Sequence, residues 1–187
     1  EEGLAHLLAY RLAGVERRER HLKHAAKRII FGSRAGIAGT VYGTIVVMAA
    51  LTAGSEGNPG LWQLSAIVAT SVLVIWIAHV YAHGLGESID RGRRLDAGEL
   101  AEIARRELAI PLAAVAPIAA LALGALEFVR DTRALWLALA IALATLMLQG
   151  ARYAGVERLS RTGTLVSIGV NTLLGLVIVA LKAGLSH

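Results

Sequence analysis

The sequence predicts an all-α integral membrane protein, a polytopic bundle of five transmembrane helices. Of its 187 residues, 56% are hydrophobic and only 18% are charged, whereas a typical soluble domain has about 25% charged residues. Several apolar runs reach about 20 residues, which is long enough to cross a hydrocarbon core of ~30 Å. The mean hydropathy of +0.60 agrees with this class. Cysteine is absent, so disulfides and thiolate metal sites are excluded.

An N-terminal helix is expected over residues 1–28, on the cytoplasmic side of the membrane. Its first half is amphipathic, because five apolar residues share one face of a helix: Leu4, Leu7, Leu8, Leu12 and Val15. Its second half is basic and is the predicted contact with anionic lipid or a partner protein. The residues of this contact are Arg17, Arg18, Arg20, Lys23, Lys27 and Arg28.

Residues 29–187 are expected to form the five-span transmembrane domain. The spans are expected, in order, near residues 32–54, 61–81, 108–126, 134–150 and 164–184. The cytoplasmic loop 82–107 separates the second span from the third. Asp96 followed by Glu99 is the pattern of a capping box, which predicts a short interfacial helix over 96–109. Pro111 is expected to start or kink the third span.

The distribution of basic residues predicts the orientation. Arginines and lysines concentrate before the first span, in loop 82–107 and in loop 151–163, whereas the opposite side has only Arg130, Arg133 and Lys182. Basic residues favour the cytoplasmic side of a membrane, so we expect the N-terminus inside and the C-terminus outside, as in a prokaryotic inner or plasma membrane. The net charge of +5 is explained by these flanks and their contact with membrane lipids, and we expect no nucleic-acid partner.

Four glycines follow one face of the first span: Gly32, Gly36, Gly39 and Gly43. Glycines at such spacing let another backbone approach closely within a membrane. The pattern therefore predicts tight helix packing, either against a helix of the same bundle or across a homodimer interface. A smooth wall along a conduit is a third interpretation.

The stretch HVYAHGLGE places His79, His83 and Glu87 at four-residue spacing near the cytoplasmic end of the second span. On a helix the three side chains share one face. Three interpretations stay open. These side chains bind water, lipid headgroups or Asp90; they sense pH or handle protons; or they ligate a divalent metal such as zinc or iron.

Inside the spans the polar side chains are neutral, and no Asp, Glu or Lys falls at mid-span. Such residues commonly form hydrogen bonds between helices. The alternative is a hydrated path for a solute, for which we select Tyr42, Thr44, Gln149 and Asn171.

The motifs of soluble enzymes are absent from the sequence: no P-loop, no dinucleotide-binding glycine pattern and no nucleophile elbow occurs. We therefore expect a protein that is not an enzyme and has no cofactor, a divalent metal being the one alternative. The predicted function is a small channel or transporter for an ion or small solute, forming a homo-oligomer because five spans enclose little room. The alternative is a non-catalytic membrane module that binds a partner protein or anionic lipid through its basic N-terminal helix.

The five-span plan with a charged loop after the second span is similar in outline to the vacuolar iron transporter class. That class uses an acidic residue in the first span and a glutamate-rich cytoplasmic helix pair as its metal site. Here the first span begins FGSRAGIAG without a carboxylate, and the loop helix offers only Glu99, Glu102 and Glu107. The resemblance covers topology alone, so it assigns no residue of this chain.

Overall fold

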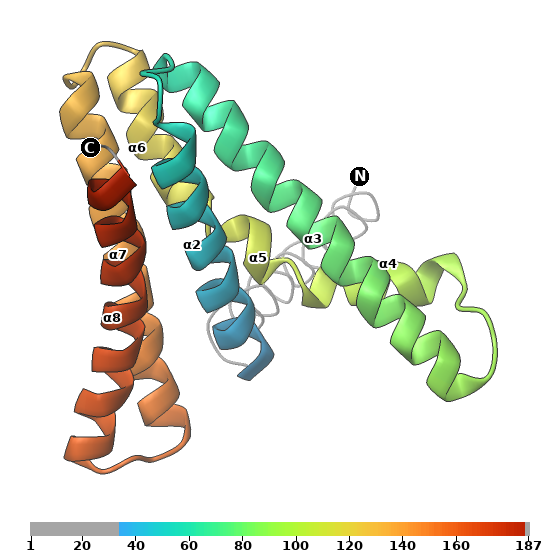
Figure 1. Cartoon of the computed structure of the whole chain (residues 1–187). Helices are drawn as coiled ribbons and strands as arrows, with labels where there is room; N and C mark the ends of the chain where they lie inside the picture. The colour runs from blue at the N-terminus through green and yellow to red at the C-terminus, as the bar shows by residue number, and fades with distance from the viewer. Residues whose placement is uncertain (1–33, 186–187) are drawn as a thin grey trace, which may run out of the picture.

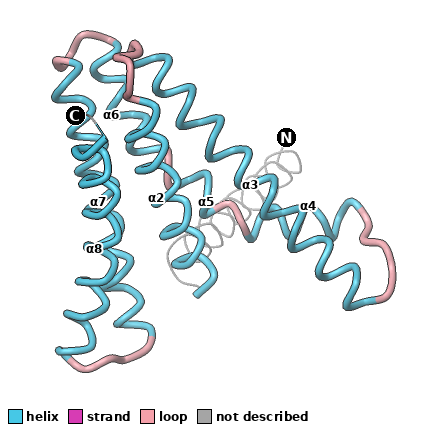
Figure 2. The backbone as a smooth tube through the Cα atoms, viewed as in Figure 1, coloured by secondary structure: helices cyan, strands magenta, loops and turns pink. Residues whose placement is uncertain are grey.

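The computed structural model of the protein describes residues 34–185, and all regular secondary structure in that range is α-helical (Figure 2). In chain order the helices are α2 (Arg34–Gly54), α3 (Leu61–Arg91), α4 (Ala97–Arg106), α5 (Ala109–Leu112), α6 (Val115–Ala125), α7 (Asp131–Val156) and α8 (Arg161–Leu185). The expected N-terminal helix over residues 1–28 lies outside the described residues.

Four of these helices, α2, α3, α7 and α8, are long and apolar enough to cross a membrane. A fifth crossing results if the helices from α4 to α6 are counted as one span. The all-helical class is thereby confirmed for the described residues, and the number of spans is four or five.

The third predicted span is not one straight helix. It consists of α5 and α6, and the segment Ala97–Leu112, which ends with α5, meets α6 at an angle of 45° across a short break between Leu112 and Val115. Pro111 lies in the first turn of α5, where its ring prevents a regular helix from continuing back into α4. Pro117 lies in the first turn of α6, where a missing N–H disrupts nothing.

Helix α3 is longer than the expected second span, because it continues past Tyr81 to Arg91. Gly84 does not interrupt it, since this glycine is buried where α4 packs, and a Cβ there would lie 3.2 Å from Leu100 Cδ1. The helix ends at Gly92, whose φ of 61° is a left-handed conformation that glycine adopts without strain.

The capping box predicted at the start of the loop helix is confirmed. The Asp96 side chain accepts a hydrogen bond from the Glu99 backbone N–H at 2.8 Å, and the Glu99 carboxylate accepts one from the Asp96 N–H at 3.0 Å. Helix α4 then packs back against the second half of α3, and the Trp76 Nε1–H donates a hydrogen bond to the Ala104 carbonyl at 3.3 Å.

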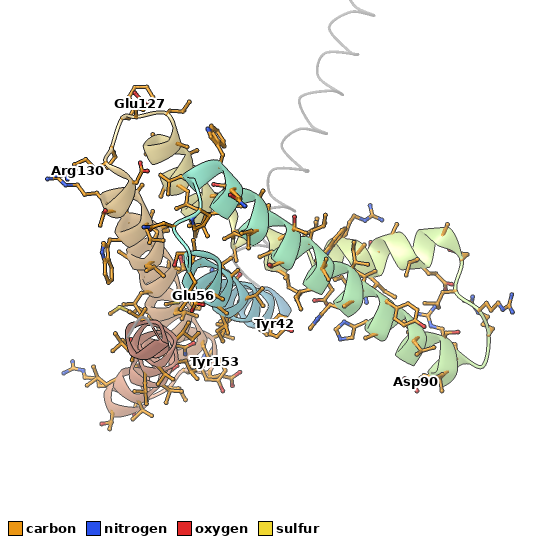
Figure 3. The ribbon with its side chains drawn as sticks, turned by 45° about the horizontal axis from the view of Figure 1, so that its top comes forward. Tyr42, Glu56, Asp90, Glu127, Arg130 and Tyr153 are labelled. Carbon is orange, nitrogen blue, oxygen red and sulfur yellow. The ribbon has the colours of Figure 1, made fainter. Side chains whose placement is uncertain are left out.

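The apolar core fills the space between α2, the first half of α3, α6 and α7. Val47, Leu51, Val68, Leu121 and Ala138 are fully buried there. Helix α7 packs against α2, α6 and α8, so the bundle is built around it. The second half of α3 leaves this bundle together with α4, and both point away from α7 and α8 (Figures 1 and 3).

Candidate functional site

Three of the four residues selected for a solute path line one pocket. Tyr42 comes from α2, Gln149 from α7 and Asn171 from α8, and the pocket between these helices has a volume of about 410 Å³. Its other lining residues are Tyr153 of α7 and four small or aliphatic residues of α2: Ile37, Ala38, Val41 and Ile45. The pocket is therefore mainly apolar, with hydrogen-bonding groups contributed by three different helices.

The polar side chains of this pocket are held by hydrogen bonds. The Asn171 amide donates to the Ser167 carbonyl at 2.9 Å, and the Ser167 hydroxyl donates to the Gly150 carbonyl at 2.9 Å, which ties α8 to α7. The Gln149 side-chain oxygen accepts from Arg152 Nη1 at 3.3 Å. The close approach of α8 needs glycine at residue 150, since a Cβ there would lie 2.9 Å from Ile168 Cα.

Thr44, the fourth selected residue, lies outside this pocket. Its side chain is fully buried, and its hydroxyl donates to the Thr40 carbonyl at 2.7 Å. The reason is helix geometry: residues two positions apart, such as Tyr42 and Thr44, point to nearly opposite faces of a helix. Thr44 is thus a packing residue of α2.

A line of rings connects the pocket with α3. Tyr42 contacts His79 with ring centroids 4.7 Å apart, and His79 contacts His83 with centroids 5.7 Å apart in an edge-to-face arrangement. Tyr42 points from α2 towards α3 (Figure 3). The two histidines selected from the sequence therefore share one face, and Tyr42 joins that face to the pocket.

The line continues from His83 to a carboxylate of the following segment. His83 Nδ1 lies 3.1 Å from Glu107 Oε1. Around this pair, α3 and α4 enclose a second pocket of about 440 Å³. Its lining residues are Ala82, His83, Gly86, Glu87, Asp90, Ile103, Arg106 and Glu107.

Glu87 lines the same pocket as His83, but its carboxylate is not paired with either histidine. Its carboxylate binds Arg91, one turn further along α3. Within residues 34–185, no three His, Asp or Glu side chains gather in a group suited to hold a metal ion. Metal ligation by His79, His83 and Glu87 stays a prediction from the sequence.

Surface ion pairs connect α3 and α4 at the corner between them. Glu99 binds Arg91 and also accepts from both terminal nitrogens of Arg93, at 2.6 and 2.9 Å. These hydrogen bonds from Arg93, together with the backbone N–H of Asp96, lower the pKa of Glu99 from 4.5 to about 2. The Arg93 guanidinium correspondingly has its pKa raised by the same carboxylate.

The glycine face of α2 packs inside the bundle. A Cβ at Gly39 would lie 3.0 Å from Ala109 Cβ, and one at Gly43 would lie 2.9 Å from Ile110 Cα. Gly36 is buried, and Gly32 lies outside the described residues. The interpretation as a homodimer interface is corrected at Gly39 and Gly43, because α5 of the same chain already covers them.

Two further residues of the two pockets, Tyr153 and Glu107, are not among the residues selected from the sequence. Tyr153 follows Gln149 by four residues, so helical spacing on α7 was a sufficient signal for it. Glu107 had no such signal, because only the folding of α4 back along α3 brings it to His83. The basic residues from Arg17 to Arg28 lie outside the described part of the chain.

No protein-family model, curated protein or solved structure matches the chain.

Proposed function

We propose that this protein is a small membrane channel or transporter for an ion or small polar solute. One observation carries the proposal: Tyr42, Gln149 and Asn171, contributed by three helices, line a single pocket among apolar helices. Neutral hydrogen-bonding groups in an apolar wall can replace part of the hydration of a solute that leaves water.

The line of rings formed by Tyr42, His79 and His83 leads from this path to its proposed mouth. His79 and His83 lead from Tyr42 to the pocket around Glu107, where charged side chains from α3 and α4 gather. Arg91, Arg93, Arg94, Arg105 and Arg106 lie at this end of the molecule. The positive-inside rule supports placing it on the cytoplasmic side, with histidines that respond to pH at the entrance.

The proposed protein is a homo-oligomer without catalytic activity. The interface is expected to use a surface other than the one around Gly39 and Gly43. Helix α8 offers such a surface, because Leu165, Val170 and Leu173 are exposed along it.

Flux through proteoliposomes tests the proposal. Purified protein is reconstituted, and the decay of imposed H⁺, K⁺, Cl⁻ and urea gradients is compared with protein-free liposomes. We expect faster decay for at least one of these probes and a several-fold loss of that flux in Asn171→Leu. Thr172→Val is the matched control. Thr172 follows Asn171 directly on α8 but does not line the pocket, and its hydroxyl donates to the Ile168 carbonyl at 2.8 Å.

The control variant should retain the flux of the unmodified protein. The proposal is wrong if none of the four gradients decays faster than in protein-free liposomes. It is equally wrong if Asn171→Leu and Thr172→Val behave alike.

A further inference from the structure

The second half of α3 and helix α4 form a hairpin, residues 76–106, with two chemically different sides. One side carries an apolar stripe on α3 at four-residue spacing: Ile77, Tyr81, Leu85 and Ile89. All four are exposed, and Ile89 at the far end is 70% exposed. The side of α3 that carries His79, His83, Glu87 and Asp90 is polar, and its residues contact Tyr42 and Glu107.

Helix α4 extends the apolar side of the hairpin. Between the two helices runs a groove of about 510 Å³, which residues 34–185 line only with aromatic, aliphatic and alanine side chains. They are Trp76, Ile77, Val80, Tyr81, Ala97, Leu100, Ala101 and Ala104. The Trp76–Ala104 hydrogen bond holds the two walls of the groove together.

The apolar side continues the surface that α3 presents within the membrane. Leu73 and Val74 are exposed on the spanning part of α3, directly before Ile77. Helix α3 has 31 residues, hence a length of about 46 Å at 1.5 Å per residue, whereas a membrane core of ~30 Å needs only about 20 residues. Figure 1 shows α3 inclined to α7 and α8, so its last turns run sideways out of the bundle.

The charged residues at the end of the hairpin indicate which kind of partner contacts its apolar side. Arg93 and Arg94 lie in the exposed connection between α3 and α4. Arg94 enters none of the ion pairs formed within residues 34–185. An apolar helix face bordered by arginine and tyrosine is typical of segments that lie in the membrane interface and contact anionic headgroups.

We propose that the hairpin lies obliquely in the leaflet where α3 ends, with lipid as its partner. The acyl chains cover the stripe from Ile77 to Ile89 and fill the groove, and anionic headgroups contact Arg94. The polar side, with His83 and Asp90, faces water. The proposal concerns the position of the hairpin in the membrane and does not depend on transport.

Single spin labels test this arrangement, because the chain has no cysteine and each introduced cysteine is unique. The test position is Ile89→Cys, and Asp90→Cys is the matched control one residue away on the polar side. Leu85→Cys repeats the test on the preceding turn. Val74→Cys on the exposed face of the spanning part of α3 is the lipid reference, and Ser160→Cys in the connection between α7 and α8 is the water reference.

The labelled proteins are placed in nanodiscs of phosphatidylcholine and phosphatidylglycerol, and collision with oxygen and with nickel-EDDA is measured by power saturation. We expect the ratio of oxygen to nickel collisions at residues 85 and 89 to match the ratio at residue 74 and to exceed the ratio at residue 90 several-fold. High nickel collision at residue 89, as at Ser160, would place the hairpin in water and overturn the proposal. Low collision with both reagents would also overturn it, because protein would then cover the stripe, either a second copy or another segment of this chain.

A change of lipid charge tests the contact between Arg94 and the anionic headgroups. Replacing phosphatidylglycerol by phosphatidylcholine should shift the label at residue 89 towards the water reference, and Arg94→Gln should remove that dependence on lipid charge. An equal depth in both lipid mixtures would refute the role of Arg94.

Discussion

Gly43 of α2 lies directly against the backbone of Ile110 in α5. A methyl group at residue 43 would lie 2.9 Å from Ile110 Cα and 3.0 Å from its carbonyl carbon, distances that no side-chain rotation can relieve. This contact joins the first span to the kinked segment after Glu107, so it also fixes where Glu107 meets His83.

The first prediction concerns this contact. Gly43→Ala should destabilise the protein by about 1–3 kcal/mol, the usual cost of overpacking a tight interior. The control is Gly169→Ala on α8, where nothing lies within 4 Å of the added methyl group. There the better helix propensity of alanine should stabilise by up to about 1 kcal/mol. Unfolding in detergent micelles by added dodecyl sulfate measures both; equal stability of the two variants would contradict the packing of α2 on α5.

The Tyr42–His79 contact predicts a measurable coupling between α2 and α3. In a double-mutant cycle of Tyr42→Leu and His79→Leu, we expect a coupling energy of about 0.5–1.5 kcal/mol, as for other ring pairs in contact. Tyr153 lines the same pocket as Tyr42, so a cycle of Tyr153→Leu with His79→Leu is the control, with a coupling near zero. Similar coupling in both cycles would show that the effect does not come from ring contact.

Acid should loosen the corner between α3 and α4. The pKa of Glu99 is lowered from 4.5 to about 2 by Arg93 and the Asp96 N–H. A lowered pKa in the folded state means that the carboxylate contributes stability above about pH 4.5 and loses it as the pH falls towards 2. A spin label at Ala101→Cys on α4 should therefore become more mobile over this range.

Glu99→Gln is the variant that isolates this carboxylate. It retains a side-chain oxygen for the Asp96 N–H but loses the charge that binds Arg93. The label at residue 101 should be more mobile at neutral pH and should respond less between pH 4.5 and 2. An unchanged acid response in Glu99→Gln would assign the loosening to other carboxylates.

The sequence alone identified most helices, because apolar length and glycine spacing are local properties. Tyr42, Gln149 and Asn171 were also recognisable, since polar side chains are rare in apolar spans. Their meeting in one pocket depends on how closely α8 approaches α7 at Gly150, which is a property of packing. Thr44 is equally polar, but its position on α2 turns its side chain away from the pocket.

Helix ends and non-local pairs were harder to predict from the sequence. A crossing of 20 residues predicts that the second span ends near Tyr81. The helix instead continues to Gly92, because Gly84 packs against Leu100 of α4 and does not interrupt it. The same extension brings α4 back along α3 and pairs His83 with Glu107. No local sequence pattern predicts such a pair, because it forms only when two helices pack against each other.

Deletion of the basic N-terminal segment distinguishes the two functions predicted from the sequence, a channel or transporter and a module that binds a partner protein or anionic lipid. Deleting residues 1–27 should leave flux through proteoliposomes intact, because Tyr42, Gln149 and Asn171, which carry the proposed path, lie in α2, α7 and α8. Binding of the purified protein to vesicles of phosphatidylglycerol should weaken if the segment contacts anionic lipid. Loss of flux on deletion would make the segment part of the transport path.

The last prediction concerns the histidines at the proposed mouth. Histidine is the side chain that ordinarily changes its charge between pH 5 and 8, and His83 forms a charged pair with Glu107 only when its imidazole is protonated. Flux should therefore vary with pH over this range, and His79→Ala/His83→Ala should flatten the profile. Glu107→Gln is the companion variant: it retains both imidazoles but removes the negative partner, so it should change the profile without abolishing flux. If the double variant keeps the pH profile of the unmodified protein, the histidines have no part in gating, and the path must be sought through Gln149 and Asn171 alone.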